Sequence, residues 1–240
     1  MAALFITGTG TGLGKTSLSL AVLAWAARLR AAYYKPVQCG AFPFGDPPVP
    51  HGDADWLRAQ APEAVYRVGY RLRLAASPHL AAEREGLTLD LDKLRREIRE
   101  LESDHDLVVM EGAGGAAVPL NRQGATLAHL AADLRLPCLL ACSPGLGTLH
   151  HTLTTCAYLQ ALGASVAGFA FVHREEKVPE LARDNADTLQ ALTGMDYWGA
   201  LPYSASLAAG RVLTPEEVEA LALPLRAGLD RWSADALSKI

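Results

Sequence analysis

The sequence predicts an α/β fold in which helices cover both faces of a mostly parallel central sheet, giving three layers. Short apolar runs alternate with segments in which apolar residues recur at helical spacing, as in βαβ units. Glycine-bearing turns follow two of these runs, and parallel sheets bind ligands beyond the carboxyl ends of their strands. With 240 residues the chain fits one domain, 1–240, because a core grows to about 250 residues before it divides.

The first half of the chain begins with the apolar run AALFIT, which predicts a strand over 2–7 that ends at a glycine-rich loop. Apolar residues at helical spacing follow over 16–29, and a second strand is expected over 32–38. Four prolines within 40–52 interrupt regular structure and predict an irregular loop. Helices are expected over 53–60 and 89–102, and the run DLVVM predicts a buried strand over 106–110.

The second half repeats this alternation. LPCLLAC predicts a strand over 136–142, and the turn SPGLG leads from it into a helix that runs to about residue 162. An apolar strand over 164–172, a helix over 181–192 and a short strand over 197–202 follow. Helical structure over 215–232 completes the expected fold.

The composition is that of a globular protein without a strong charge bias. The net charge is -4 and no run of Lys or Arg occurs, so we expect neither a nucleic-acid nor a membrane partner. The four cysteines lack CxxC spacing and are expected to be buried thiols. The N-terminus shows no leader pattern and no stretch of about 18 apolar residues occurs, so we expect a cytoplasmic protein.

The stretch GTGTGLGKTS over 8–17 is typical of a phosphate-binding loop. Its glycines let backbone N–H groups approach an anion at the N-terminus of a helix. Lys15 adds a positive charge for the β- and γ-phosphates, and the Thr16 hydroxyl is a candidate ligand for Mg²⁺. The loop is one residue longer than the general GxxxxGK[ST] pattern. These features predict a P-loop NTPase-like fold that binds a nucleoside triphosphate.

Further charged residues follow the expected strands. Lys35 in YYKPV would point into the same crevice as Lys15, which predicts a second anion beside the γ-phosphate; a solvated lysine is the alternative. Glu111 follows LVVM, where P-loop proteins place a carboxylate that holds Mg²⁺. Asp53 and Asp55 are both candidates for a further carboxylate or for a helix cap, and the start of the helix favours Asp53.

Together these motifs resemble the dethiobiotin synthetase family. GTGTGLGKT is similar to the family's GTxTxxGKT, including the additional residue, and YKPVQCG is similar to YKPVxSG. SPH over 77–79, MEGAGGAAVPL over 110–120 and LGTLHHTLTT over 146–155 resemble SPH, VEGAGGxxxPL and LGxxNHxxLT. The motifs fall in the family's order from residue 8 to about residue 203.

The resemblance implies an ATP-dependent ligase of biotin synthesis. Its substrate would be 7,8-diaminononanoate, which reacts with CO₂ through a carbamate and a carbamic–phosphoric anhydride to give dethiobiotin, ADP and phosphate. ATP would be the co-substrate and Mg²⁺ the cofactor. The family is homodimeric, so the resemblance also implies an active site at a subunit interface.

The same resemblance implies individual site residues. The catalytic residues would be Lys35, Lys15 and Thr11, and the metal ligands Thr16, Asp53 and Glu111. The residues expected to bind the nucleotide are Gly12, Leu13, Gly14, Lys15, Thr16, Ser17, Asp53, Glu111, Gly112, Ala113, Gly114, Val172, His173, Pro202, Tyr203 and Ser204. The residues expected to bind the substrate are Cys39 and, from the other subunit, Gly147, Thr148, Leu149 and His150.

Several positions depart from the family's pattern. Cys39 replaces a serine beside the substrate, and His150 stands where asparagine is usual. Val172 and His173 replace an Asn-Asp pair whose asparagine reads the adenine edge. We therefore expect a relaxed nucleotide preference, with CTP or another triphosphate competing with ATP.

Two other classes of protein share the expected core. Amide-forming synthetases of the cobyrinate type carry a glutaminase domain, for which 240 residues leave no room. ParA/MinD-like switch ATPases carry an additional lysine near the start of the loop, and no lysine precedes Gly14 here. A basic amphipathic tail for membrane binding is also not evident. Both alternatives are therefore less well supported than the ligase.

Overall fold

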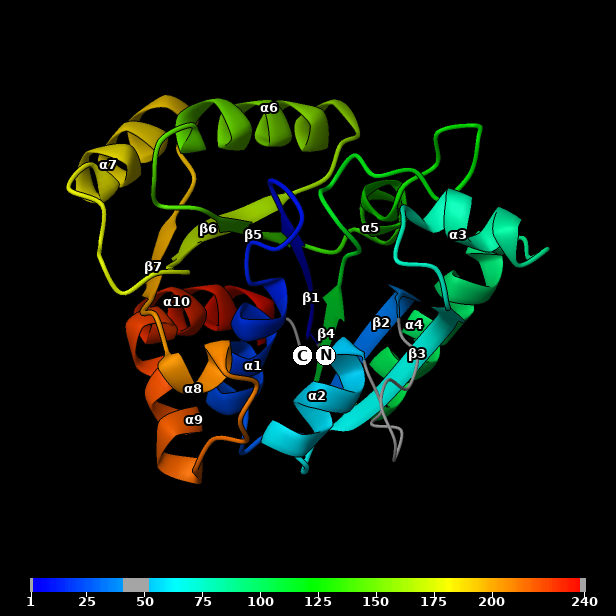
Figure 1. Ribbon diagram of the computed structural model, residues 1–240, viewed down its shortest axis with the longest axis horizontal. Helices are drawn as coiled ribbons and strands as arrows, with labels where there is room; N and C mark the ends of the chain where they lie inside the picture. Colours follow the sequence, from blue (N-terminus) through cyan, green and yellow to red (C-terminus); the bar gives the residue numbers. More distant parts are fainter. Residues whose placement is uncertain (1, 41–51, 238–240) are drawn as a thin grey trace.

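The computed structural model describes residues 2–40 and 52–237. Within these ranges seven strands form one sheet in the order β3-β2-β4-β1-β5-β6-β7, and each neighbouring pair is parallel (Figure 1). The strands are β1 (Ala2–Gly8), β2 (Ala31–Cys39), β3 (Val65–Leu72), β4 (Leu107–Glu111), β5 (Cys138–Cys142), β6 (Val166–Val172) and β7 (Tyr197–Leu201). The predicted parallel sheet is confirmed.

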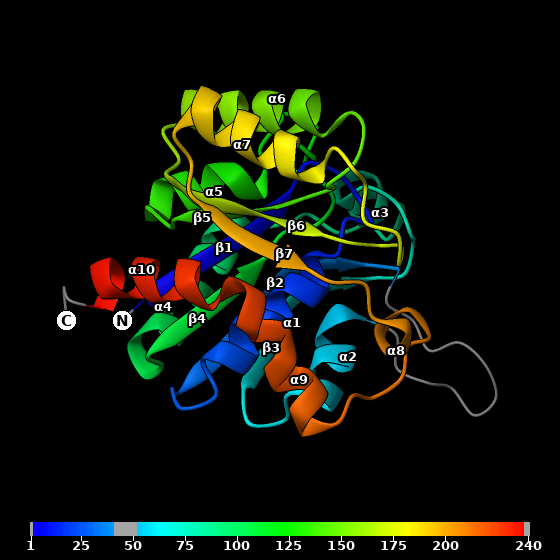
Figure 2. The same cartoon turned by 90° about the vertical axis from the view of Figure 1, so that its left-hand side faces the viewer.

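Helices cover both faces of the sheet, as expected, and Figure 2 shows the two helical layers on either side of it. The helices are α1 (Lys15–Trp25), α2 (Asp53–Gln60), α3 (Pro78–Arg84), α4 (Leu91–Asp104), α5 (Leu127–Leu134), α6 (Thr148–Ala161), α7 (Ala182–Thr193), α8 (Ala205–Ala208), α9 (Pro215–Ala222) and α10 (Arg226–Leu237), with a 3-10 turn η1 (Leu223–Leu225). One apolar core lies between the sheet and α3 to α7, and a second lies between the sheet and α1, α2, α9 and α10. No helix in the described ranges is long and apolar enough to cross a bilayer.

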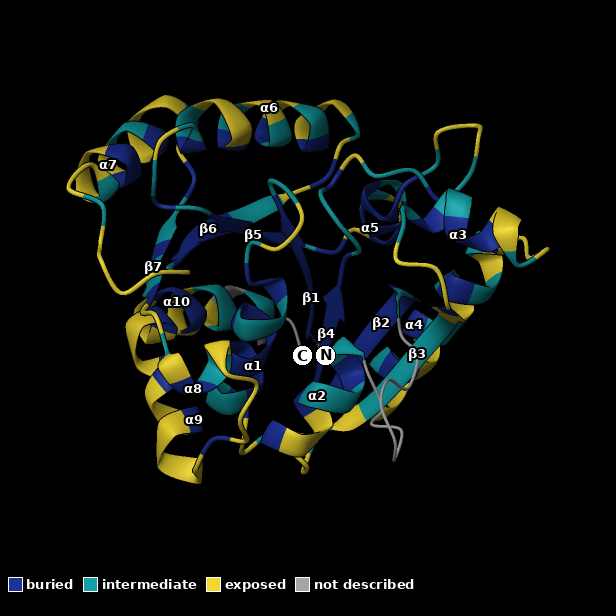
Figure 3. Ribbon diagram, in the orientation of Figure 1, coloured by how far each residue is buried: buried dark blue, intermediate teal, exposed yellow. Residues whose placement is uncertain are grey.

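Burial on both faces explains the composition of the central strands. Every residue of β1, β4 and β5 is buried, and Figure 3 shows these strands dark blue while the outer helix faces are yellow. Such strands are continuous apolar runs because neither face meets water. Cys138, Cys142 and Cys156 belong to this interior as free buried thiols. The polar residues in the buried strands are therefore exceptions that require an explanation.

The structure also contains elements that the sequence pattern did not predict. β3 is an edge strand whose residues are mostly half-exposed, so Arg67 and Arg71 interrupt the apolar run that marks a buried strand. The short helices α3, α5 and α8 were not predicted either. The helix expected over 16–29 ends at Trp25. The irregular loop predicted over 40–52 falls mainly on residues 41–51, which lie outside the described residues.

The order of the strands brings distant parts of the chain together at one edge. β4 lies between β2 and β1, with Ile6 paired to Glu111 and Tyr33 paired to Val109. The carboxyl ends of β1, β2 and β4 are consequently neighbours. Glu111 ends β4, and Lys35 lies within β2, four residues before the strand ends at Cys39.

We expect Gly199→Ala to destabilise the fold strongly, because β7 packs closely on η1 at this residue. The φ angle of Gly199 is +126°, and an added Cβ would lie 2.2 Å from the carbonyl oxygen of Pro224. The expected loss of unfolding free energy is about 3 kcal/mol, measured by urea denaturation. Gly194 is the matched control: its φ is +68° but its surroundings are open, so Gly194→Ala should cost about 1 kcal/mol. Equal losses for the two variants would contradict the role of the contact with Pro224.

Candidate active site

The glycine-rich loop joins β1 to α1 at the carboxyl edge of the sheet. Gly12 and Gly14 have φ angles of +72° and +83°, which L-residues rarely adopt. At Gly14 a Cβ would also lie 2.5 Å from Cγ1 of Val172, so both conformation and space require glycine there. α1 begins at Lys15, directly after this glycine, and its N-terminus carries the positive end of the helix dipole. The loop thus has the geometry of an anion site.

A cavity of about 620 Å³ opens beside this loop. Its walls come from the loop and the start of α1, from β2, from the start of α2, from the segment 75–78, and from the stretch that follows β4. The charged side chains that line it are Lys15, Lys35, Asp53, Glu111 and Arg174. Six separate segments of the chain, including the one that carries Arg174 after β6, therefore contribute to one site.

Lys35 is buried in this cavity wall, in contrast to the solvated alternative. Its Nζ lies 2.6 Å from Asp53 Oδ2 and 2.7 Å from Glu111 Oε1, and it donates to the carbonyl of Gly112 at 3.0 Å. Lys35 is 3% exposed and Glu111 1% exposed. An ammonium group has three donors, and all three are occupied. The buried lysine and the two carboxylates thus form one hydrogen-bonded cluster.

The Glu111 carboxylate is fully hydrogen-bonded. Oε1 accepts from Lys35 Nζ at 2.7 Å and from Thr16 Oγ1 at 3.0 Å. Oε2 accepts from Ser19 Oγ at 2.8 Å and from Tyr33 OH at 3.0 Å. Burying a carboxylate is costly unless it is paired and hydrogen-bonded, and both conditions are met here.

The two lysines differ in their electrostatics. Burial lowers the pKa of Lys15 from its ordinary value, and the attraction of Glu111 does not restore it. Burial also opposes the charge on Lys35, but Glu111 and Asp53 outweigh it, so the pKa of Lys35 is raised. Burial opposes ionisation of Asp53. The positive charge of Lys35 and the hydrogen bonds with Lys35, Thr16 and Gln38 outweigh burial, so the pKa of Asp53 is lowered. The Lys35 and Asp53 shifts both stabilise the fold at neutral pH: the contribution from Lys35 fades as pH rises through its folded pKa, and that from Asp53 fades as pH falls through its folded pKa.

The structure separates the roles of Asp53 and Asp55. Asp53 is the first residue of α2, and its carboxylate bonds Lys35 rather than capping the helix. Asp55 forms a two-pronged ion pair with Arg71, with distances of 2.7 and 3.0 Å. Asp53 therefore faces the cavity and Asp55 is engaged with β3.

The oxygen atoms at this site fit Mg²⁺. Thr16 and Glu111 are hydrogen-bonded to each other, and Asp53 adjoins them through Lys35. Mg²⁺ prefers hard oxygen ligands and is usually bound by one or two carboxylates together with substrate phosphates. The described residues contain no cluster of three or more His, Cys, Asp or Glu that would hold a metal by itself.

The predicted nucleotide residues beyond the loop lie at the ends of β6 and β7. Val172 is buried against Gly14, and His173 donates its backbone N–H to Leu201. Burial lowers the pKa of His173, and its Nδ1 is buried without a partner among the described residues. Pro202 and Tyr203 are exposed after β7, and the Ser204 side chain caps α8.

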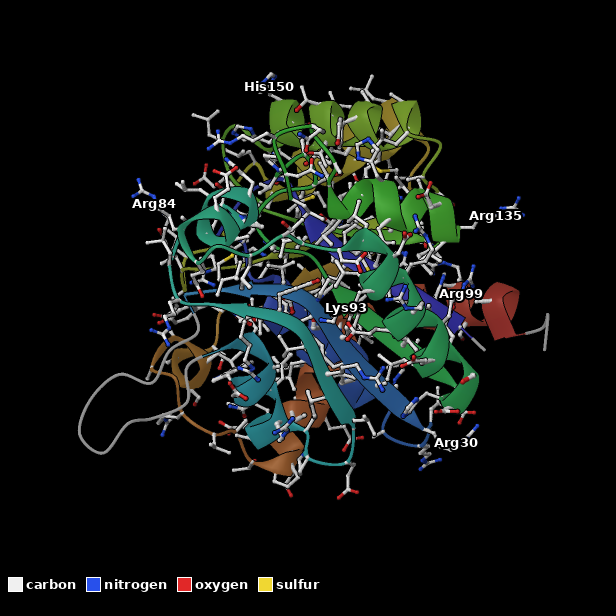
Figure 4. The ribbon with its side chains drawn as sticks, turned by 90° about the vertical axis from the view of Figure 1, so that its right-hand side faces the viewer. Arg30, Arg84, Lys93, Arg99, Arg135 and His150 are labelled. Carbon is white, nitrogen blue, oxygen red and sulfur yellow. The ribbon has the colours of Figure 1, made fainter. Side chains whose placement is uncertain are left out.

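The predicted substrate residues divide into two groups. Cys39 lines the cavity, and burial raises the pKa of its thiol to about 11. Gly147 and Thr148 stand at the N-terminus of α6 and, with Leu149 and His150, are not part of the cavity wall. Figure 4 shows His150 projecting outward from that end of α6. In a single chain the second group therefore lies apart from the loop.

Sequence reasoning missed several residues of the site. Ser19 and Tyr33 bind Glu111, Gln38 accepts from the backbone of Asp53, and Arg174 lines the cavity. Spacing provided a signal for two of them: Tyr33 precedes Lys35 by two residues on the same strand face, and Ser19 follows Lys15 by one helical turn. No pattern marks Arg174.

We expect Lys35→Met to lower the unfolding free energy by about 3 kcal/mol, because it leaves the buried Glu111 without its cation. In the double variant with Glu111→Gln the buried pair is replaced by two neutral side chains, and only the partly exposed Asp53 keeps its charge, so much of the loss should be recovered. Urea denaturation at neutral pH measures all the variants. A double variant whose loss equals the sum of the two single losses would show that the pair is not coupled.

Comparisons with known proteins agree with the geometry. A family model described as an AAA domain matches residues 2–211. The protein named ATP-dependent dethiobiotin synthetase BioD from Anoxybacillus flavithermus is 31% identical over 90% of this chain and 99% of its own length. Its namesake from Rhodococcus jostii is 38% identical over 84% of this chain and 87% of its own.

Solved structures show the fold alone. A chain of the MinC:MinD cell division protein complex from Aquifex aeolicus superposes with a TM-score of 0.62 at 10% identity, covering 98% of this chain and 96% of that one. MinD from Pyrococcus furiosus gives 0.58 at 16% identity, covering 97% and 100%. They confirm the P-loop NTPase-like fold. The family of the chain is shown by the relatives that are similar in sequence. The chain belongs to the family of ATP-dependent dethiobiotin synthetases.

Proposed function

We propose that this chain is an ATP-dependent dethiobiotin synthetase, which converts 7,8-diaminononanoate, CO₂ and ATP to dethiobiotin, ADP and phosphate. The observation that carries the proposal is the buried Lys35, which shares its carboxylate partners with the metal site beside the phosphate loop. Nucleotide binding alone needs only the lysine of the loop. A second lysine in the same cavity suits a reaction in which another anion approaches the γ-phosphate.

The nucleotide would be held mainly by the loop and the start of α1. Backbone N–H groups from Gly12 to Ser17 would surround the phosphates, and Lys15 would reach the β- and γ-phosphates. Ala113 and Gly114, which follow β4, line the same cavity, and the carbonyl of Gly112 accepts from Lys35. The base would lie between the ends of β6 and β7, near Val172, His173 and the residues Pro202, Tyr203 and Ser204.

Thr16, Asp53 and Glu111 would hold Mg²⁺, which when bound neutralises charge on the phosphate oxygens. The reaction itself would begin with one amine bonding to CO₂ and losing a proton, which gives a carbamate. A carbamate oxygen attacks the γ-phosphorus while the bond to ADP breaks. Lys15 and Lys35 stabilise the negative charge that accumulates there, and Thr11, which lines the cavity, would contact the transferred group.

Ring closure completes the sequence. The second amine attacks the carbamate carbon, the bond between that carbon and the phosphate oxygen breaks, and phosphate leaves as the amine loses its proton. No covalent bond to the protein is formed, so positioning of the substrate provides the remaining catalysis. Cys39 and the segment 75–78 form the cavity wall available to the diamine.

A homodimer would supply the other end of the substrate site. Gly147, Thr148, Leu149 and His150 of a second copy would place the N-terminus of α6 against the substrate's carboxylate. Leu146, directly before them, is 97% exposed in the single chain and so would be available to contact the second copy. The MinD-like switch is less favoured, because its support is limited to fold likeness at 10% to 16% identity.

The reaction is tested by phosphate release from purified protein with MgATP and bicarbonate, with and without 7,8-diaminononanoate. We expect release to depend on the diamine and to match dethiobiotin detected by mass spectrometry. Lys35→Met should lower kcat about 100-fold or more, because one transition-state cation is lost. Lys177→Ala, which removes an exposed lysine outside the cavity wall, should leave the rate unchanged. Release indifferent to the diamine would contradict the proposal and favour a switch ATPase.

The end of β6 predicts a weak nucleotide preference. Val172 offers no hydrogen bond to a base, and apolar contacts discriminate between ligands by only about 10- to 200-fold. We expect kcat/KM values for ATP, CTP, GTP and UTP to fall within about 100-fold. Val172→Asn should increase the preference for ATP. An ATP preference of about 10⁴-fold in the unaltered protein would refute this expectation.

A further inference from the structure

The four hydrogen bonds to Glu111 divide into two pairs with different surroundings. Lys35 and Thr16, which bond Oε1, both line the cavity. Ser19 and Tyr33, which bond Oε2, are each 0% exposed and do not line it. One oxygen of the carboxylate thus faces the site, and the other is held from within the protein.

The two donors on the cavity side have further roles in the proposed function. Thr16 would bind the metal, and Lys35 would meet the phosphoryl group and the carbamate. The bond from Lys35 to Glu111 would weaken when an anion arrives, because the ammonium is then shared, and the Thr16 hydroxyl would have to orient its proton to suit the metal at its oxygen. Ser19 and Tyr33 lie behind the cavity wall, where no ligand competes for them. Their bonds to Oε2 can persist throughout the reaction.

Tyr33 reaches Glu111 because of the sheet register. It precedes Lys35 by two residues on β2, so both side chains are on the same face. Its partner on β4 is Val109, which precedes Glu111 by two residues on that face. This placement lets the Tyr33 hydroxyl donate to Glu111 Oε2 at 3.0 Å.

We propose that Tyr33, assisted by Ser19, is a positioning residue that fixes the Glu111 carboxylate for metal binding. The last torsion of a glutamate side chain has a broad energy minimum, so a carboxylate held at one oxygen can rotate. Hydrogen bonds to the second oxygen fix the carboxylate plane. Loss of such outer partners of a metal ligand typically lowers metal affinity 10- to 100-fold. The inference rests on the proposed nucleotide and metal site.

Tyr34 provides a matched control. It is the next residue of β2 and points to the opposite face, into the core beneath α4. It is also 0% exposed, and its hydroxyl donates to Glu97 Oε2 at 2.5 Å. Tyr34→Phe therefore removes a phenol–carboxylate bond of the same kind away from the cavity. Tyr33→Phe keeps the ring and its contact with Tyr66, whose ring centroid is 5.7 Å away.

The experiment measures ADP binding by calorimetry in EDTA and over a series of Mg²⁺ concentrations, together with Mn²⁺ binding by electron paramagnetic resonance. For Tyr33→Phe we expect about tenfold weaker metal affinity and an unchanged ADP affinity in EDTA. Tyr34→Phe should match the unaltered protein in both. Ser19→Ala should shift metal affinity in the same direction as Tyr33→Phe, and it provides the test if Tyr33→Phe does not fold.

Three results would overturn the inference. One is unaltered metal affinity in Tyr33→Phe and Ser19→Ala. The second is an equal loss of metal affinity in Tyr34→Phe. The third is a loss of ADP affinity in EDTA as large as the loss in Mg²⁺. Either of these two results would indicate a structural effect. If the unaltered protein itself binds ADP without dependence on Mg²⁺, the proposed metal site fails as well, and that failure is visible before any variant is made.

Discussion

The structure of the site depends on the burial of one cation between two carboxylates. Lys35 and Glu111 lie deep in an apolar sheet, where an isolated charge would be very unfavourable. The opposite charges of Lys35 and Glu111 compensate each other, and Asp53, at the start of α2, adds a second carboxylate to Lys35. The surrounding structure must therefore hold three segments in register to within a hydrogen-bond length. That requirement links the stability of the sheet edge to the chemistry of the site.

The parallel sheet meets this requirement through its strand order. β4 lies between β1 and β2, so the loop that follows β1 and the lysine of β2 adjoin the glutamate of β4. Close packing at Gly14 then fixes the loop against the end of β6, because any larger residue would collide with Val172. The site is thus assembled from residues separated by more than 100 positions in sequence, without a dedicated binding domain.

Residues of the site were predictable from the sequence where their type is unusual for their surroundings, and they were missed where it is ordinary. Lys35 and Glu111 interrupt or end apolar runs that must be buried, where a charge is conspicuous, and Lys15 belongs to a recognisable glycine-rich loop. β3 could not be recognised because an edge strand carries polar residues such as Arg67 on its exposed side. Tyr33 was missed because a tyrosine in a buried strand looks like ordinary core; its spacing from Lys35 indicates the shared face, and the cross-strand register brings its hydroxyl to Glu111. The roles of Asp53 and Asp55 became clear only from their ion-pair partners, Lys35 and Arg71, which cannot be deduced from the sequence.

The ammonium group of Lys35 already has a full set of hydrogen-bond acceptors in the structure. Its three protons are already bonded to Asp53, Glu111 and the carbonyl of Gly112, so an incoming anion finds no free donor there. An anion can engage this lysine only by displacing one of those acceptors, and a lone sulfate or phosphate ion offers little to compensate for the displaced carboxylate. A nucleotide that brings its own divalent cation can satisfy the carboxylates as it takes the lysine. The cluster is therefore better matched to an anion that carries a divalent cation than to an inorganic anion alone.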